Sequence, residues 1–103
     1  MRAEENQDYE ALELTTLMIK NIPIKFMQND MLNLLNEKFS GKYDFFYLPM
    51  DLKTKYNVGF AFINMIHPLF ILDFYLEFNA MKWNEKVAEC NSQKYCEIMY
   101  ANM

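Results

Sequence analysis

Phe60 and Phe62 are the residues whose type and spacing point most directly to a chemistry. They lie in Val58–Met65, a run that we predict to be a strand. Because successive side chains of a strand alternate between its faces, both phenylalanines share one face, and Gly59 and Ala61 share the other, packed closely against helices. Exposed aromatic rings are unfavourable unless something covers them. A nucleic-acid base can do so, because every base has a π-face that stacks on a flat ring.

Few other side chains are candidates for catalysis or metal binding. His67, the only histidine, directly precedes Pro68, so we expect a role at a helix entry rather than in catalysis. Cys90 and Cys96 lack CxxC spacing and suit a reduced, intracellular protein. No His, Cys, Ser or carboxylate cluster has usable spacing for catalysis or metal binding. We expect no enzyme, metal, cofactor or small-molecule substrate; a small phosphatase would also need an arginine within the domain, and the only arginine is Arg2.

Four strands and two helices can be placed from periodicity, proline and glycine. The predicted strands are Thr15–Asn21, Tyr43–Leu48, Val58–Met65 and Lys94–Ala101, and the predicted helices are Asn29–Phe39 and Leu69–Asn79. Between them lie a polar, flexible loop, Met50–Asn57, and a connection, Ala80–Gln93, that we expect Trp83 to anchor to the core. The order βαββαβ predicts the ferredoxin-like α+β fold, in which two helices cover one face of a four-stranded antiparallel sheet.

The sheet face without helices is the predicted binding surface. Phe45 and Tyr47 are placed on it by alternation alone, opposite Phe46 and Leu48, and Glu97 joins it from the last strand. The side chains expected to contact a single-stranded nucleic acid are Met18, Lys20, Phe45, Tyr47, Lys53, Lys55, Phe60, Phe62 and Met99. The alternative for the two phenylalanines of the third strand is packing against the N-terminal segment or a C-terminal element.

The net charge of −4 argues at first against a nucleic-acid partner. Residues 1–13 carry five acids and one base, so the remaining 90 residues hold nine acids and nine bases. We therefore expect an acidic, flexible leader over residues 1–13 and a single neutral domain over residues 14–103. Lysines are in excess in residues 14–56, where Lys20, Lys53 and Lys55 could contact phosphates. Binding should rest more on stacking than on phosphate neutralisation.

Val58–Met65 resembles the octamer of the RNA recognition motif, and Leu17–Ile22 resembles its hexamer. Longer strings resemble the Mei-two-like proteins, regulators of meiosis and development in fungi, plants and protists, over about residues 14–102: Thr15–Pro23, Tyr43–Asp51, Asn57–Asn64, and Phe78-Asn79 with Trp83. The resemblance is to the C-terminal RNA recognition motif of that family. It implies single-stranded RNA binding by one domain of a larger post-transcriptional or developmental regulator, with Met18 and Val58 as the family's own substitutions.

The second predicted helix has two apolar stripes. Its core face holds Ile71, Phe74, Tyr75 and Phe78, and a second stripe holds Leu69, Leu72 and Leu76. The second stripe favours an alternative function, a protein-binding module or homodimer that uses this helix or the sheet face. The competing interpretation is that residues 80–93 cover the leucines. The sequence has no run of 18 apolar residues, so it indicates no membrane span. We expect an intracellular protein, nuclear or cytoplasmic.

Overall fold

The computed structural model describes residues 14–87 and 90–101, so the predicted leader lies outside the described residues. The elements are β1 (Thr16–Lys20), α2 (Gln28–Phe39), β2 (Tyr43–Tyr47), β3 (Phe60–Met65), α3 (Leu69–Phe78), α4 (Trp83–Lys86) and β4 (Glu97–Tyr100). All six predicted elements are present, and their ends differ from the prediction by three residues at most, at the start of β4. None of the described helices is long and apolar enough to cross a membrane.

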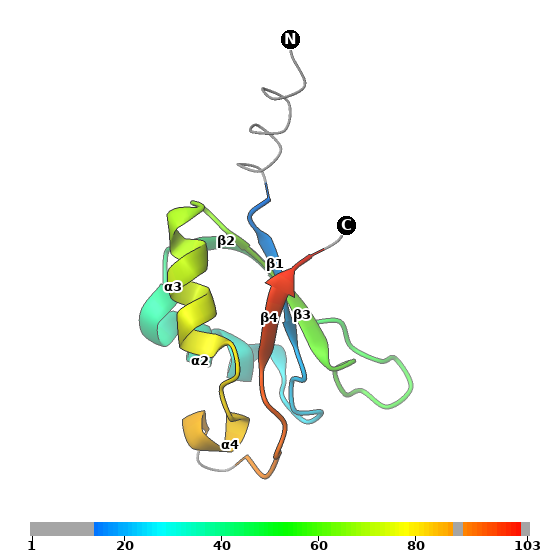
Figure 1. Ribbon diagram of the computed structural model, residues 1–103. Helices are drawn as coiled ribbons and strands as arrows, with labels where there is room; N and C mark the ends of the chain where they lie inside the picture. The colour runs from blue at the N-terminus through cyan, green and yellow to red at the C-terminus, as the bar shows by residue number, and fades with distance from the viewer. Residues whose placement is uncertain (1–13, 88–89, 102–103) are drawn as a thin grey trace.

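The four strands form one antiparallel sheet in the order β2-β3-β1-β4. The central strands β1 and β3 are aligned from the pair Thr16–Asn64 to the pair Lys20–Phe60. The two long helices, α2 and α3, lie on the same side of this sheet and leave its other face free of helices (Figure 1). The predicted ferredoxin-like fold is confirmed.

The core lies between the sheet and the helices because each strand turns alternate apolar side chains inward. The buried residues contributed by the strands and by α2 and α3 are Leu17, Ile19, Ala61, Ile63, Met65, Ile98, Met31, Leu34, Leu35, Phe39, Phe74 and Phe78. Tyr75 is half-exposed, so its predicted place on the core face of α3 is wrong. A tyrosine can hold this position because its hydroxyl accepts a hydrogen bond from Asn79 Nδ2 (3.1 Å) at the surface.

The helix α4 was not predicted, because one turn is too short to show an apolar period. Its first residue, Trp83, is fully buried and meets the ring of Phe26 edge-on, which confirms that it anchors the connection to the core. Glu77 of α3 accepts hydrogen bonds from Lys86 of α4 (2.6 Å) and Lys38 of α2 (3.1 Å). These two lysines, Lys86 first, lower the pKa of the Glu77 carboxyl.

Candidate nucleic-acid interface

The strand register arranges the helix-free face, called the open face below, into three rows of side chains. The first row is Phe60–Lys20–Glu97, the second is Tyr47–Phe62–Met18–Met99, and the third is Phe45–Asn64–Thr16. Each member stands on a different strand from its neighbours, so a row spans the sheet rather than running along one strand. Seven of the nine predicted contact residues are thereby brought together on one surface: Met18, Lys20, Phe45, Tyr47, Phe60, Phe62 and Met99.

The second row is apolar across all four strands. Tyr47 at one end is 52% exposed and Met99 at the other is 43% exposed, while Phe62 and Met18 between them are partly buried. Phe62 meets the ring of Phe60 edge-on, with 5.7 Å between the ring centroids.

The first and third rows carry the polar groups of the open face. Lys20 Nζ lies 3.8 Å from Glu97 Oε1, and both side chains are about half-exposed. In the third row, Asn64 Oδ1 accepts hydrogen bonds from the hydroxyls of Thr15 and Thr16 (2.8 Å each), and its Nδ2 donates to Asp44 Oδ1 (2.8 Å). Asn64 was not among the predicted contact residues, although the alternation that places Phe60 and Phe62 outward also places Asn64 on this face.

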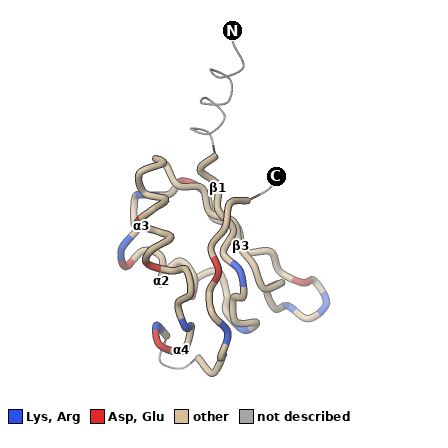
Figure 2. Tube along the Cα trace, viewed as in Figure 1, with Lys and Arg blue, Asp and Glu red and all other residues tan. Residues whose placement is uncertain are grey.

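The loop between β2 and β3 holds Lys53 and Lys55. Both are exposed, and Figure 1 shows the loop projecting beyond the edge of the sheet. Its turns are hydrogen-bonded: the carbonyl of Asp51 accepts from the N–H of Lys55 (2.8 Å), and the Asp51 carboxylate accepts from the N–H of Lys53 (2.8 Å). Figure 2 shows charges of both signs on this loop, so the field that it offers to a phosphate is modest.

Asn57 joins this loop to the one between β1 and α2. It is the one buried polar residue within residues 14–87 and 90–101. Its Nδ2 lies within hydrogen-bond distance of the carbonyl oxygens of Pro23 (2.8 Å), Ile24 (3.1 Å) and Phe26 (2.9 Å). Its Oδ1 accepts from the N–H of Gly59 (2.7 Å). The amide therefore fixes where β3 begins relative to the end of β1.

Gly59 precedes β3, and its predicted packing against the helices is wrong. A Cβ added there would meet no atom within 4 Å. The backbone explains the glycine instead, because its φ of +97° is strained for any residue with a side chain. The carbonyl of Gly59 accepts from the N–H of Ile22 (2.9 Å), which ties this unusual conformation to the end of β1.

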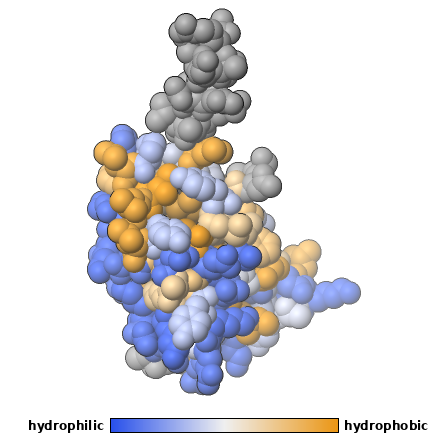
Figure 3. Space-filling view, in the orientation of Figure 1, coloured by the Kyte–Doolittle hydropathy of each residue, from blue (hydrophilic) through white to orange (hydrophobic). Residues whose placement is uncertain are grey.

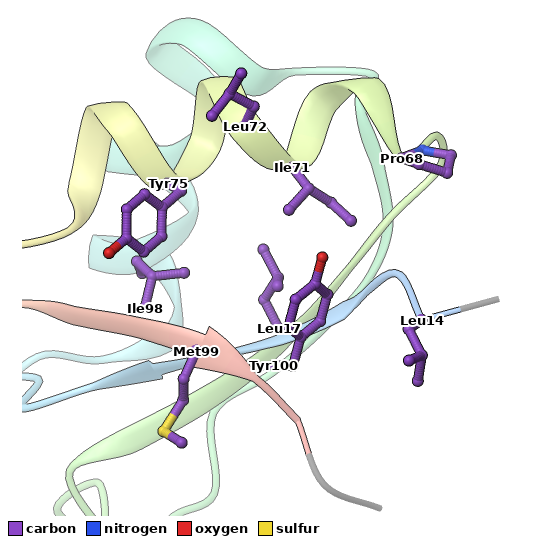
Figure 4. Close-up of a pocket in the computed structure, with 9 residues that line it drawn as sticks. All are labelled: Leu14, Leu17, Pro68, Ile71, Leu72, Tyr75, Ile98, Met99 and Tyr100. Atoms are coloured by element: carbon purple, nitrogen blue, oxygen red, sulfur yellow. The ribbon is translucent and has the colours of Figure 1, made fainter. Parts of the chain in front are cut away.

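The outer stripe of α3 stays uncovered. Its leucines Leu69, Leu72 and Leu76 are between 62% and 74% exposed, so the interpretation that residues 80–93 cover them is wrong for the described residues. Apolar side chains gather over α3 in Figure 3. Beside them a groove of about 520 Å³ lies between α3 and the end of β4, with Ile71 and Tyr100 among its lining residues (Figure 4).

The remaining reactive side chains have structural surroundings. His67 Nδ1 accepts from the N–H of Leu69 (3.1 Å), which confirms its role at the entry of α3. Cys96 is buried, and burial, followed by the charge of Glu97, raises the pKa of its thiol to about 12. In the described part of the chain, no three His, Cys, Asp or Glu side chains are grouped as a metal site would require.

A βαββαβ sheet with paired aromatic residues on the free face of β3 is the architecture of an RNA recognition motif. The chain belongs to the RNA recognition motif 2 family, whose model matches residues 14–103. Over 89 residues it is 51% identical both to Protein MEI2-like 3 of Arabidopsis thaliana and to Protein MEI2-like 2 of Oryza sativa subsp. japonica. The match covers 86% of this chain but only 11% and 10% of those proteins. The resemblance inferred from the sequence strings is confirmed, and the family is not one of enzymes.

Solved structures show the same fold at low sequence identity. A Sxl-lethal protein/RNA complex has a TM-score of 0.66 at 19% identity, covering 86% of this chain and 47% of that one. The Rna15 RRM with bound RNA (GU) has a TM-score of 0.65 at 15% identity, covering 86% of this chain and 84% of that one. These two neighbours were solved with RNA.

Proposed function

We propose that this chain binds single-stranded RNA by stacking bases on the open face. The observation that carries the proposal is the second row, Tyr47–Phe62–Met18–Met99, an apolar strip that crosses all four strands without a helix over it. Phe60 and Phe45 flank the strip in the neighbouring rows. Membership of an RNA recognition motif family, and neighbours that were solved with RNA, support the same function.

Stacking supplies most of the affinity in this proposal. Each base–aromatic stack contributes about 1–3 kcal/mol. The lysines predicted to contact phosphates are Lys20, Lys53 and Lys55, and Lys20 already has Glu97 beside it. With few phosphate contacts, the affinity should depend only modestly on salt concentration. Met18, which stands where the family's hexamer usually has an aromatic residue, would make a softer contact with a base or ribose.

The proposal is tested by replacing Phe60 and Phe62. Each single change to alanine should weaken binding of a uridine-rich heptanucleotide by roughly 5- to 150-fold, the factor that corresponds to the loss of one stack. Fluorescence anisotropy with an end-labelled oligonucleotide at low salt measures the dissociation constants. Phe62→Tyr keeps a flat ring and should retain the affinity, whereas Phe62→Leu keeps an apolar side chain and should not.

Tyr75→Ala is the matched control, because Tyr75 is an exposed aromatic residue on α3, which covers the opposite face of the sheet. It should leave the dissociation constant unchanged. Thermal unfolding of each variant establishes that it is folded at the temperature of the titration. An undetectable affinity of the unmodified chain, or an affinity that survives Phe60→Ala combined with Phe62→Ala, would show that the stacking mechanism is wrong.

The relatives support a larger setting for the domain. The chain spans about a tenth of the length of the MEI2-like proteins that it matches. Within such a protein, an RNA-binding domain would serve post-transcriptional control of meiosis or development, in the nucleus or the cytoplasm. Both cysteines are free thiols, which suits a reducing compartment.

A second candidate function is favoured by the outer stripe of α3. Three leucines on consecutive turns are exposed beside an apolar groove, and a surface of this kind commonly contacts another protein. The occupant that can be tested directly is a second copy of this chain, with the stripe of one α3 packed against that of another.

A further inference from the structure

An ion pair between Lys20 and Glu97 lies beside Phe60 in the first row. Lys20 and Glu97 stand on the adjacent strands β1 and β4, in the same row as Phe60 on β3. Neighbouring strands are about 4.8 Å apart, so the two polar ends converge roughly one to two strand spacings from the ring of Phe60. A base stacked on Phe60 would turn one edge toward this pair.

The two charged groups are free to change partners. Lys20 Nζ and Glu97 Oε1 are 3.8 Å apart, and the side chains are 40% and 53% exposed. An exposed pair at this separation holds its geometry weakly, so a base can displace it without a large loss. No hydrogen bond within the described residues occupies the carboxylate of Glu97, whereas Asp44, near the third row, already accepts from Asn64.

The donor and acceptor pattern of the pair matches one base better than the others. A carboxylate only accepts hydrogen bonds and an ammonium only donates them. The Watson–Crick edge of guanine presents two adjacent donors, N1–H and the N2 amino group, beside one acceptor, O6. Adenine and cytosine present one amino donor beside ring acceptors that repel a carboxylate, and uracil presents one N–H between two carbonyl oxygens.

We propose that Glu97 and Lys20 select guanine for the base that stacks on Phe60. Glu97 accepts from N1–H and N2–H of the guanine, and Lys20 donates to O6. This inference rests on the proposed RNA-binding function and adds its base preference. A bidentate contact of this kind commonly discriminates against other bases by roughly 5- to 150-fold.

Four pentanucleotides test the proposal, each with uridine at the outer four positions and guanine, adenine, cytosine or uridine at the centre. Isothermal titration calorimetry at low salt gives their dissociation constants for the unmodified chain. The guanine oligonucleotide should bind at least about fivefold more tightly than each of the others. Glu97→Gln replaces one acceptor oxygen by a donor amide at constant size, and should bring the four dissociation constants within about twofold of one another.

Glu85→Gln is the matched control, because it removes an exposed carboxylate from α4, away from the open face. It should preserve the preference for guanine, and so exclude a general effect of the lost negative charge. Thermal unfolding of Glu97→Gln establishes that the variant is folded at the temperature of the titrations.

Four results would overturn the inference. Equal binding of all four oligonucleotides by the unmodified chain would leave the proposed function standing and remove the base preference. A guanine preference that persists in Glu97→Gln, or a preference for another base, would remove the role of Glu97. Absence of binding to any of the four would overturn the proposed function together with the inference.

Discussion

The buried side chain of Asn57 holds together two loops that support the open face. Its amide spans two loops, and three carbonyl oxygens and one N–H converge on it in a buried site. Without it, the segment that begins at Pro23 and the residue that precedes β3 would each need another partner. The two strands that carry Lys20 and Phe60 meet at this junction, so the first row of the open face depends on it.

Replacing Asn57 by alanine should therefore lower the free energy of unfolding by about 2–4 kcal/mol, because several buried backbone groups lose their partner at once. Urea unfolding followed by the fluorescence of Trp83, the single and buried tryptophan, measures the change. Asn33→Ala is the control: Asn33 is exposed on α2, and alanine is a better helix former there, so stability should stay constant or rise slightly. Equal losses in both variants would contradict this role for Asn57.

The predictability of individual residues depended on how far a local pattern determines them. Alternation along β3 was sufficient to place Phe60 and Phe62 outward and Ala61 inward, because strand geometry alone decides the face. Alternation says nothing about a positive φ, so the reason for Gly59 was misjudged. Asn57 was missed because its partners lie 31 to 34 residues earlier in the chain, and only the folded structure brings them together.

The helix α3 is buried on one side and exposes an apolar stripe on the other. Its inner side buries Phe74 and Phe78, whereas its outer leucines stay in water beside the groove. Burying such a stripe against a second copy would remove three large apolar side chains per chain from solvent. Leu14 and Leu17, at the start of the described chain, line the same groove and extend its apolar surface beyond the helix.

If the second candidate function is correct, the chain should self-associate with rising concentration. Sedimentation velocity between about 10 and 500 μM should then show a shift from monomer to dimer. Leu72→Asp should abolish the shift, because a charge within the seam would be desolvated without a partner. Leu52→Asp is the control, since Leu52 is highly exposed in the loop after β2. A chain that stays monomeric throughout would contradict self-association through α3.

The four strands and the helices α2 and α3 could be predicted from the sequence, whereas the one-turn helix α4 could not. α2 and α3 each carry an apolar period over at least two turns, and each strand is bounded by proline, glycine or polar residues. α4 is a single turn whose position is decided by Trp83 reaching the core, a tertiary contact. The exposure of Leu69, Leu72 and Leu76 could not be predicted either. It depends on the path of residues 80–93, and that path is set by the contact of Trp83 with the core.

For the whole molecule, the main division is between two faces of one sheet. One face is closed by helices over a continuous core, and the other presents an apolar row between two rows of mixed aromatic and polar side chains. The formal charge of −4 describes the chain as a whole and conceals that residues 14–103 are neutral. A neutral domain with an aromatic face gains little from long-range attraction, so recognition should depend on contact with the bases.

The most direct test of RNA binding by the open face is a ¹H–¹⁵N correlation spectrum recorded during titration with a short single-stranded RNA. We expect the largest amide shifts in the strands of the open face, with Tyr47, Phe62 and Met18 of the second row among them, while Leu69, Leu72 and Leu76 of α3 stay unchanged. Shifts that instead cluster on α3, with Tyr47, Phe62 and Met18 unaffected, would contradict RNA binding by the open face.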